Sequence, residues 1–171
     1  GGVGKTTLAN IVYNKNYERF DGGCFLANVR ETSRKPNGLV ELQREILSCI
    51  LNRKHERILS VEEGVAKLKD AMFYRRIILI LDDVDQVELL DAIIGSTRDL
   101  FNLGSKIIIT TRQENLLKSY PDCAVLKLRC FHSYMSMQIF SQHAFGQNFP
   151  SDAWLDLAAR IRDRCQGLPL A

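Results

Sequence analysis

The apolar positions of this sequence follow two different periods. Two short runs, residues 77–81 and 107–109, are apolar at every position, which is typical of parallel-sheet strands covered by helices on both faces. Between such runs, apolar residues recur three or four positions apart, as they do on the buried face of a helix. Strands that alternate with helices in this way predict an α/β fold with a doubly wound parallel sheet.

Turn and capping residues bound the predicted elements. Gly22 and Gly23 precede a short apolar run, and a polar loop over residues 30–37 follows it. Ser60 is a predicted N-cap, because Glu63 stands three residues later and completes a capping box. The predicted strands cover residues 24–29, 77–81, 106–109 and 124–127, and the predicted helices begin near residues 5, 38, 60 and 87.

From residue 133 onward the pattern changes to helices alone. Helical spacing predicts one helix over residues 137–145 and another over 154–161, with Ser151 in the N-cap region between them. This tail resembles the start of a small helical subdomain. The predicted division is therefore an α/β nucleotide-binding domain over residues 1–130 and the beginning of a helical subdomain over 131–171.

Composition and charge exclude several classes of protein. With 46% hydrophobic and 25% charged residues, the 171-residue chain is an ordinary globular domain. A net charge of +3, with scattered basic residues, indicates neither nucleic-acid nor membrane binding. The five cysteines have no metal-ligand or redox spacing, and His55, His132 and His143 show no catalytic arrangement. An odd number of cysteines suits a reducing compartment, and the sequence given contains no signal peptide or transmembrane run, so the cytoplasm or the nucleus is expected.

The opening residues, Gly1-Gly2-Val3-Gly4-Lys5-Thr6-Thr7, have the pattern of a phosphate-binding loop that runs into a helix. Glycines let backbone N–H groups turn toward a phosphate, and the helix N-terminus adds partial positive charge there. Lys5 is predicted to reach the β- and γ-phosphates, and the Thr6 hydroxyl to ligate Mg²⁺. The helix that follows carries Leu8, Ile11 and Val12 on one face. The alternative is a glycine-rich turn that only caps an ordinary helix.

The loop pattern is incomplete in this sequence. The full motif G-x-x-x-x-G-K-[ST] has a further glycine five positions before Gly4, whereas the sequence given starts three positions before it. We therefore expect the chain to be an internal part of a longer protein, in which a strand precedes the loop. Because that strand would lie in the centre of the sheet, we expect these residues to fold poorly by themselves.

Two acidic residues, Asp82 and Asp83, come directly after the buried run 77–81. Open α/β sheets bind ligands at the carboxyl ends of their strands, so the pair is predicted to lie at a binding site. We assign Asp82 to Mg²⁺, and Asp83 to orienting or deprotonating an attacking water. Arg112 ends another strand and is a candidate cation for the γ-phosphate. The alternatives are an Asp-rich strand exit and an arginine that is only a surface charge.

Five motifs of this chain stand in the order and approximate spacing of the NB-ARC domain of plant nucleotide-binding, leucine-rich-repeat disease-resistance proteins. The chain resembles that family over its whole length. Asp85 and residues 20–31 resemble the branch that carries an N-terminal Toll/interleukin-receptor-like domain, whereas Leu100 and Asn102 replace a usual Trp and Gly. The motifs are G-G-V-G-K-T-T, F-D-G-G-C-F-L-A-N-V-R-E, I-I-L-I-L-D-D-V-D, G-S-K-I-I-I-T-T-R, and G-L-P-L-A, which ends at Ala171.

The resemblance implies an ADP/ATP-bound molecular switch in plant innate immune signalling, reset by slow ATP hydrolysis. It implies that the strand ending in Arg112 lies between the strand before the loop and the strand ending in Asp82. By physics alone Pro169 only begins a further helix after a stop at Gly167; the resemblance places it against the adenine. The residues it assigns to nucleotide, Mg²⁺ and hydrolysis are Gly2, Val3, Gly4, Lys5, Thr6, Thr7, Asp82, Asp83, Arg112 and Pro169.

In the parent protein, the resemblance further implies intramolecular partners, namely leucine-rich repeats and an N-terminal signalling domain, and oligomerisation on activation. Two other functions stay open. One is a turnover P-loop ATPase or kinase, although neither lid arginines nor an arginine finger is identifiable. The other is an interaction scaffold without hydrolysis. A GTPase is disfavoured because the sequence lacks an N-K-x-D motif.

Overall fold

The computed structural model describes residues 1–53, 57–95, 102–120 and 123–170. His55, Leu100 and Ala171, named above, lie outside these ranges. The chain forms two compact units, one made of Thr6–Cys123 and the other of Gly1–Lys5 with the chain from Ala124 onward. Within the described residues, no helix is long and apolar enough to span a membrane.

The larger unit is built on a three-stranded parallel sheet. Its strands are β1 (Gly22–Leu26), β2 (Ile77–Val84) and β3 (Lys106–Thr111), and β2 lies between the other two. Phe25 pairs with Ile80, and Ile80 pairs with Ile108, so the strands run in register toward the same edge. The sequence prediction of a parallel α/β sheet is therefore confirmed.

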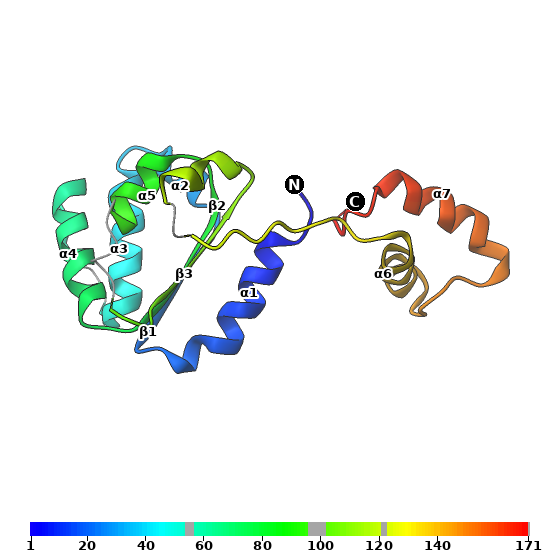
Figure 1. The fold of residues 1–171 in the computed structure, drawn as a ribbon, viewed down its shortest axis with the longest axis horizontal. Coiled ribbons are helices and arrows are strands. Elements are labelled where there is room, and N and C mark those ends of the chain that lie inside the picture. Colours follow the sequence, from blue (N-terminus) through cyan, green and yellow to red (C-terminus); the bar gives the residue numbers. More distant parts are fainter. Residues whose placement is uncertain (54–56, 96–101, 121–122, 171) are drawn as a thin grey trace. The chain divides into compact units, whose positions relative to one another are not determined.

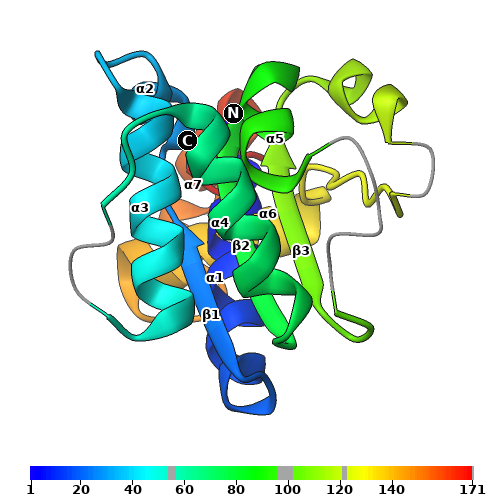
Figure 2. The ribbon, with the colours of Figure 1, turned by 90° about the vertical axis from the view of Figure 1, so that its left-hand side faces the viewer.

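Helices cover both faces of this sheet, as the apolar runs predicted (Figures 1 and 2). On one face lies α1 (Lys5–Asn16), which belongs to this unit from Thr6 on. The other face carries α3 (Gly38–Leu51), α4 (Val61–Phe73) and α5 (Val87–Ile94). Short helices complete the unit, namely α2 (Val29–Ser33) and two 3₁₀ segments, Tyr17–Arg19 and Glu114–Ser119.

Side chains along β2 alternate between the two faces of the sheet, as in any strand. Ile78 and Ile80 pack against Ala9 of α1. Leu79 and Leu81 pack in the larger core beneath α3, α4 and α5. All four side chains are buried. The regular alternation ends after Leu81, because the register of β2 against β3 shifts there and Val84 packs in the same core as Leu81.

Gln43 joins the three helices of the larger core. It is fully buried on α3, and its Nε2 donates hydrogen bonds to the carbonyl oxygens of Val61 (3.0 Å) and Ala92 (2.7 Å), at the start of α4 and within α5. Gly64 leaves the room for this amide, because a Cβ at that position would overlap the Gln43 side chain. The three helices consequently pack as one layer over the strands.

The capping prediction for α4 is confirmed, with one difference in detail. The Ser60 hydroxyl accepts a hydrogen bond from the Glu63 N–H (3.3 Å), as a capping box requires. The Glu63 carboxylate accepts from the N–H of Leu59 (2.8 Å), one residue before the cap. This bond and the Lys67 side chain lower the pKa of Glu63.

The prediction for the buried face of α1 does not hold. Leu8 and Ile11 are exposed, and Ala9 is the buried residue of this helix. Ala9 and Tyr13 face the sheet instead and pack in the cluster around Ile80. A small residue opposite the middle of a strand allows close helix-to-sheet packing, and the helical period alone does not identify which stripe meets the sheet.

Two other predicted elements differ in the structure. Residues 30–37, predicted as a loop, begin within the short helix α2, which starts at Val29 after Asn28 adopts a left-handed conformation (φ 51°). Residues 124–127, predicted as a strand, are extended and exposed but form no strand. A strand needs a neighbour for its N–H and C=O groups, and the described residues of that unit include no strand.

The smaller unit contains the two predicted helices, α6 (Ser133–Phe145) and α7 (Leu155–Cys165), with a 3₁₀ turn at Asp152–Trp154 before α7. The Ser151 side chain makes no capping hydrogen bond within the described residues. After α7, Gly167 is left-handed (φ 75°), and its carbonyl oxygen accepts a hydrogen bond from the N–H of Phe131 (2.8 Å). A Cβ at Gly167 would overlap the Phe131 carbonyl, so only glycine allows this approach.

Cysteines distant in the sequence meet in the larger unit. Cys24 of β1 is buried, and Cys49 of α3 is exposed, yet their thiols form a hydrogen bond. This bond lowers the pKa of Cys49 to about 7, while the same bond and burial raise the pKa of Cys24. Both remain free thiols. Sequence spacing gave no indication of this pair, because strand β1 and helix α3 bring the residues together.

Candidate functional site

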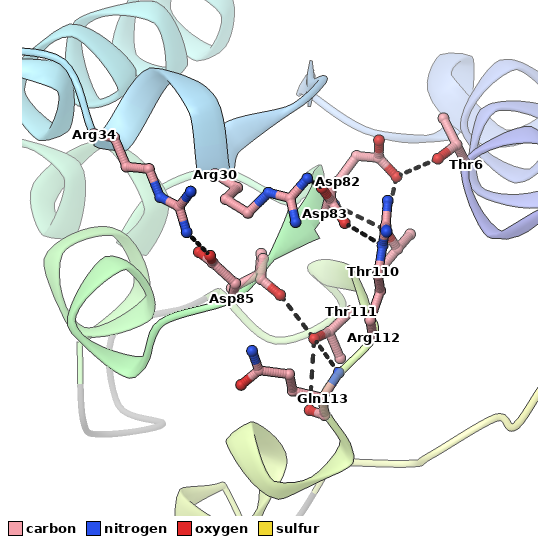
Figure 3. Close-up of polar contacts among 11 residues, drawn as sticks. Thr6, Arg30, Arg34, Asp82, Asp83, Asp85, Thr110, Thr111, Arg112 and Gln113 are labelled. Carbon is pink, nitrogen blue, oxygen red and sulfur yellow. Dashed lines mark hydrogen bonds and ion pairs between the residues drawn. The ribbon is translucent and has the colours of Figure 1, made fainter. Parts of the chain in front are cut away.

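The residues with candidate chemistry in the larger unit gather at the carboxyl ends of β2 and β3 (Figure 3). Asp82 is 2% exposed, and its Oδ1 accepts two hydrogen bonds. One comes from the Thr6 hydroxyl at the start of α1 (2.7 Å), and the other from the Thr110 hydroxyl at the end of β3 (2.6 Å). Asp82 points to the α1 face because it continues the alternation of Ile78 and Ile80.

Thr110 also fixes the backbone of the next acidic residue. Its oxygen accepts a hydrogen bond from the N–H of Asp83 (2.9 Å). Asp83 is left-handed (φ 61°), and the pairing between β2 and β3 shifts register between Leu81 and Val84. Aspartate tolerates this conformation better than most residues do, and an irregular strand end of this kind is common beside functional sites. The single Thr110 hydroxyl thus links the two acidic residues.

Asp83, unlike Asp82, is held by two arginines. Its Oδ2 pairs with Arg30 of α2 (2.9 Å), and its Oδ1 pairs with the Nε of Arg112, which follows β3 (3.1 Å). The exposed fractions of these side chains are 18% for Asp83, 30% for Arg30 and 55% for Arg112. Each carboxylate oxygen therefore has its own guanidinium partner.

A second ion pair runs parallel to the first one (Figure 3). Arg34 pairs with Asp85 Oδ2 (2.6 Å), four residues after Arg30 on one side and two after Asp83 on the other. Asp85 Oδ1 is buried and has no hydrogen-bond partner among the described residues. Arg30 within α2 and Arg34 at its C-cap thus pair with acidic residues at the end of β2 and just after it.

The glycine-rich loop lies in the smaller unit up to Lys5. Gly2 and Gly4 have positive φ angles, 81° and 92°, with Val3 between them. Successive residues whose φ angles alternate in sign turn their backbone N–H groups toward one side, and the concave group of donors that results suits an anion. A Cβ at Gly4 would meet nothing within 4 Å, so this side of the loop is open, whereas a Cβ at Gly2 would lie 3.3 Å from the Leu170 Cβ. The loop conformation therefore fits a phosphate.

Pro169 lies in the same smaller unit, where it lines a hollow of about 290 Å³ between α6 and α7. Phe140, Ile139 and Leu168 contribute apolar walls, and Arg162 is the basic side chain at its edge. A largely apolar hollow with one cation is compatible with a planar heterocycle.

The predicted site residues therefore separate into two groups. Thr6, Asp82, Asp83 and Arg112 meet through hydrogen bonds and ion pairs in the larger unit. Thr7 is exposed in the first turn of α1. The remaining predicted residues, Gly2, Val3, Gly4, Lys5 and Pro169, belong to the smaller unit.

Sequence reasoning missed Arg30. It stands just beyond the carboxyl end of β1, at the same edge of the sheet as Asp83 and Arg112, because all three strands run in parallel. A charged residue shortly after every strand end is the signal that identifies such a residue. Arg30 did not stand out by this signal, because it is the first residue of the range 30–37, which has the composition of a polar loop.

The residues present fit a magnesium ion bound together with phosphate. The Thr6 hydroxyl donates its hydrogen bond to Asp82, which leaves the lone pairs of the Thr6 oxygen for a cation, and Thr6 is exposed. Within the described ranges, no cluster of three or more His, Cys, Asp or Glu side chains is placed to hold a metal ion. Magnesium typically binds one or two protein oxygens together with substrate phosphates and water, which is what Thr6 and Asp82 offer.

Comparisons with known proteins agree with this geometry. Residues 1–149 match the NB-ARC domain family. The chain is 36% identical over 172 aligned positions to disease resistance protein RPV1 of Vitis rotundifolia, covering all of this chain and 12% of that protein. It is 34% identical to disease resistance protein RUN1 of the same species and 32% identical to TMV resistance protein N of Nicotiana glutinosa, with all of the chain and 13% and 15% of those proteins covered.

The chain thus spans less than a sixth of the length of these relatives. The family match extends from the glycine-rich loop through both acidic residues and α6. The parallel sheet flanked by helices and the polar cluster at the carboxyl edge are what a nucleotide-binding domain requires. This chain belongs to the NB-ARC family of nucleotide-binding domains.

Proposed function

We propose that this chain is an ADP/ATP-binding molecular switch in plant innate immune signalling. The single observation that carries the proposal is the hydrogen bond of 2.7 Å between the Thr6 hydroxyl and Asp82. It joins the first turn of the helix after the glycine-rich loop to the acidic end of β2, within one unit of the fold. Those are the two elements that a P-loop protein uses for phosphate and Mg²⁺.

Each site residue has a role in this proposal. The backbone N–H groups of Gly2, Val3 and Gly4 receive the phosphates, and Lys5 approaches the β- and γ-phosphates as a point charge. Bound Mg²⁺ supplies positive charge to the phosphate oxygens. The remaining assignments are Thr6 and Asp82 as Mg²⁺ ligands, Thr7 beside the phosphates, Asp83 for the attacking water, Arg112 for the γ-phosphate and Pro169 against the adenine.

The environment of Asp83 supports a switch more than a fast enzyme. Both of its oxygens pair with guanidinium groups, at 2.9 and 3.1 Å. Because each carboxylate oxygen already accepts from a guanidinium group, an attacking water has to compete with these two contacts for Asp83. Slow hydrolysis is the expected consequence, and it suits a protein whose nucleotide state persists long enough to be read by other domains.

The biological setting of the proposal comes from the relatives. Proteins named for disease resistance align with all of this chain, and each is several times longer. We therefore place the switch in plant defence, in the cytoplasm or the nucleus. Its partners would be leucine-rich repeats and an N-terminal signalling domain of the parent protein, with oligomerisation on activation. Exchange of ADP for ATP drives the change only if the two conformations bind the two nucleotides with different affinities.

The test is nucleotide content and exchange in the full-length protein that carries this chain. Purified protein is expected to retain ADP, exchange it slowly for ATP in the presence of Mg²⁺, and turn over far less than once per second. Lys5→Ala should abolish retention, because no other side chain replaces its charge at the phosphates. Lys15→Ala is the matched control, since Lys15 lies on the same helix in its last turn.

Three results would contradict the proposal in different ways. Several turnovers per second would indicate an ordinary ATPase. Folded protein without nucleotide, and without affinity for it, would indicate a scaffold. Equal nucleotide retention in the Lys5→Ala and Lys15→Ala proteins would remove the glycine-rich loop from the binding site.

A further inference from the structure

We infer that Arg30 is a positioning residue that sets the preference of this domain for ATP over ADP, because it keeps Asp83 paired when Arg112 moves to a terminal phosphate. The inference rests on the proposed function. It concerns a residue that lies in the motif over residues 20–31 but has no role in the proposed ligand set.

The two arginines occupy separate atoms of one carboxylate. Arg112 contacts Oδ1 through Nε (3.1 Å), and Arg30 contacts Oδ2 (2.9 Å). Because the contacts do not share an oxygen, one guanidinium can leave without displacing the other. The two arginines also differ in exposure, 55% for Arg112 and 30% for Arg30. Arg112 is therefore the partner that is free to exchange, and Arg30 is the one that stays.

The backbone on both sides of the Arg30 contact is held firmly. Val29, the residue before Arg30, is completely buried in the main core. The N–H of Asp83 is bonded to the Thr110 hydroxyl (2.9 Å). These two attachments hold Arg30 and Asp83 opposite each other (Figure 3). An exposed ion pair between long side chains normally gains little stability, because ordering the two side chains costs conformational entropy. That cost is smaller for the Arg30–Asp83 pair, whose backbone is already fixed.

Charge explains why this arrangement acts on nucleotide choice. A third phosphate brings additional negative charge to the site, and it attracts the Arg112 guanidinium. If Arg112 were the only partner of Asp83, its departure would leave an unpaired carboxylate near that phosphate, and like charges repel. With Arg30 in place, Asp83 keeps one cation throughout. ADP has no third phosphate, so its binding does not require the transfer.

The experiment measures equilibrium affinity for ADP and for a non-hydrolysable ATP analogue in Mg²⁺, using the full-length protein. Arg30→Ala is expected to shift the ratio of the two dissociation constants toward ADP by about tenfold, a common size for coupling between two contacts. Arg30→Lys should restore most of the ratio, since it keeps the charge. Arg34→Ala is the matched control, because Arg34 pairs with Asp85 from one turn further along.

A double variant separates the coupled role from a structural one. In an Arg112→Ala background, Arg30→Ala should shift the affinity ratio less than it does in the unaltered protein, because the transfer of Arg112 no longer occurs and only the repulsion between Asp83 and the third phosphate remains. The inference is overturned if Arg30→Ala weakens both nucleotides equally, if Arg34→Ala shifts the ratio as much, or if the two arginine changes are additive. Should Arg30→Ala fail to fold, Arg30→Gln, which keeps most of the side-chain length but removes the charge, supplies the same comparison.

These outcomes are distinct from failure of the proposed function. If the unaltered protein binds neither nucleotide, the proposed function is wrong and the inference falls with it. If the unaltered protein discriminates between ATP and ADP, and the ratio is unchanged in Arg30→Ala, only the inference is wrong.

Discussion

Asp82 and Asp83 are adjacent in the sequence, yet they lie in two different environments. The Asp82 region is buried, and the donors to its carboxylate are the neutral hydroxyls of Thr6 and Thr110. The Asp83 region is more open, and its donors are the guanidinium groups of Arg30 and Arg112. The two regions share one group, the Thr110 hydroxyl, which donates to Asp82 and accepts from the Asp83 N–H.

The difference shows how one strand end can prepare two chemical roles. Neutral donors stabilise the Asp82 carboxylate without cancelling its charge, so it can still attract a metal ion. The arginines beside Asp83 compensate its charge, so it has little left to offer a cation. The irregular end of β2 accompanies this difference, because Asp82 and Asp83 together stand opposite Thr110 and Asp83 is left-handed. The two environments are therefore set by the neighbours of each carboxylate before any ligand binds.

Asp82→Asn should have the largest effect of the changes proposed, and this effect should be on the Mg²⁺ dependence of nucleotide binding. An asparagine oxygen can still accept from the hydroxyls of Thr6 and Thr110, so we expect little change in thermal stability. The negative charge is lost, and the Mg²⁺-dependent part of nucleotide affinity should fall about 100-fold or more, because loss of even an outer partner of a metal site costs up to about 100-fold. Calorimetric titration with nucleotide, with Mg²⁺ and with EDTA, measures that part directly.

Asp83→Asn is the control for this prediction. It is expected to keep the Mg²⁺ dependence of binding, because its carboxylate is already paired with two arginines. A loss of Mg²⁺ dependence as large as that of Asp82→Asn would break the comparison, since both residues would then serve the metal.

Thr110→Val should have an intermediate effect, mainly on stability. The change keeps the shape of the side chain but removes the hydroxyl, so the Asp83 N–H loses its acceptor and the buried Asp82 loses one donor. We expect about 1–3 kcal/mol of lost stability, the usual cost of leaving buried polar groups unpaired. Chemical denaturation measures it.

Two threonine variants sharpen the Thr110 prediction. Thr110→Ser retains the hydroxyl and should stay close to the unaltered protein. Thr111→Val removes a neighbouring hydroxyl that donates to the Val84 carbonyl (2.7 Å) and touches neither acidic residue. If Thr111→Val changed Mg²⁺ affinity more than Thr110→Val, the shared hydroxyl would not be the link between the two regions.

The sequence was sufficient to predict the strands that carry the site. All-apolar runs identified β2 and β3, and the acidic pair and Arg112 were correctly placed at their carboxyl ends. Parallel strands place their carboxyl ends at one edge, so their contact follows from topology. Arg30 was not predicted, since α2 is only five residues long, too short to show a helical period.

Other errors share a physical cause: a local sequence pattern does not determine which element it will pack against. Residues 8–12 have helical spacing, but which stripe of α1 is buried depends on how Ala9 meets Ile80 on the sheet. Residues 124–127 have the composition of a strand, but a strand also needs a partner. The hydrogen bond between the Cys24 and Cys49 thiols likewise depends on packing between two elements.

Arg34→Ala should have the smallest effect of these changes. The Arg34 side chain is 61% exposed, so solvent and salt screen its contact with Asp85 despite the short distance of 2.6 Å. We expect less than about 1 kcal/mol of lost stability, typical of exposed ion pairs, and a smaller loss as salt is raised.

Denaturation of Arg34→Ala and Arg30→Ala at low and high salt compares the two parallel pairs. Arg30→Ala should lose more stability than Arg34→Ala, and its loss should depend less on salt, because Arg30 is less exposed and its backbone is anchored by buried Val29. Equal losses with equal salt dependence would mean that both pairs are ordinary surface contacts, and the Asp83 region would then lack the fixed cation that separates it from the Asp82 region.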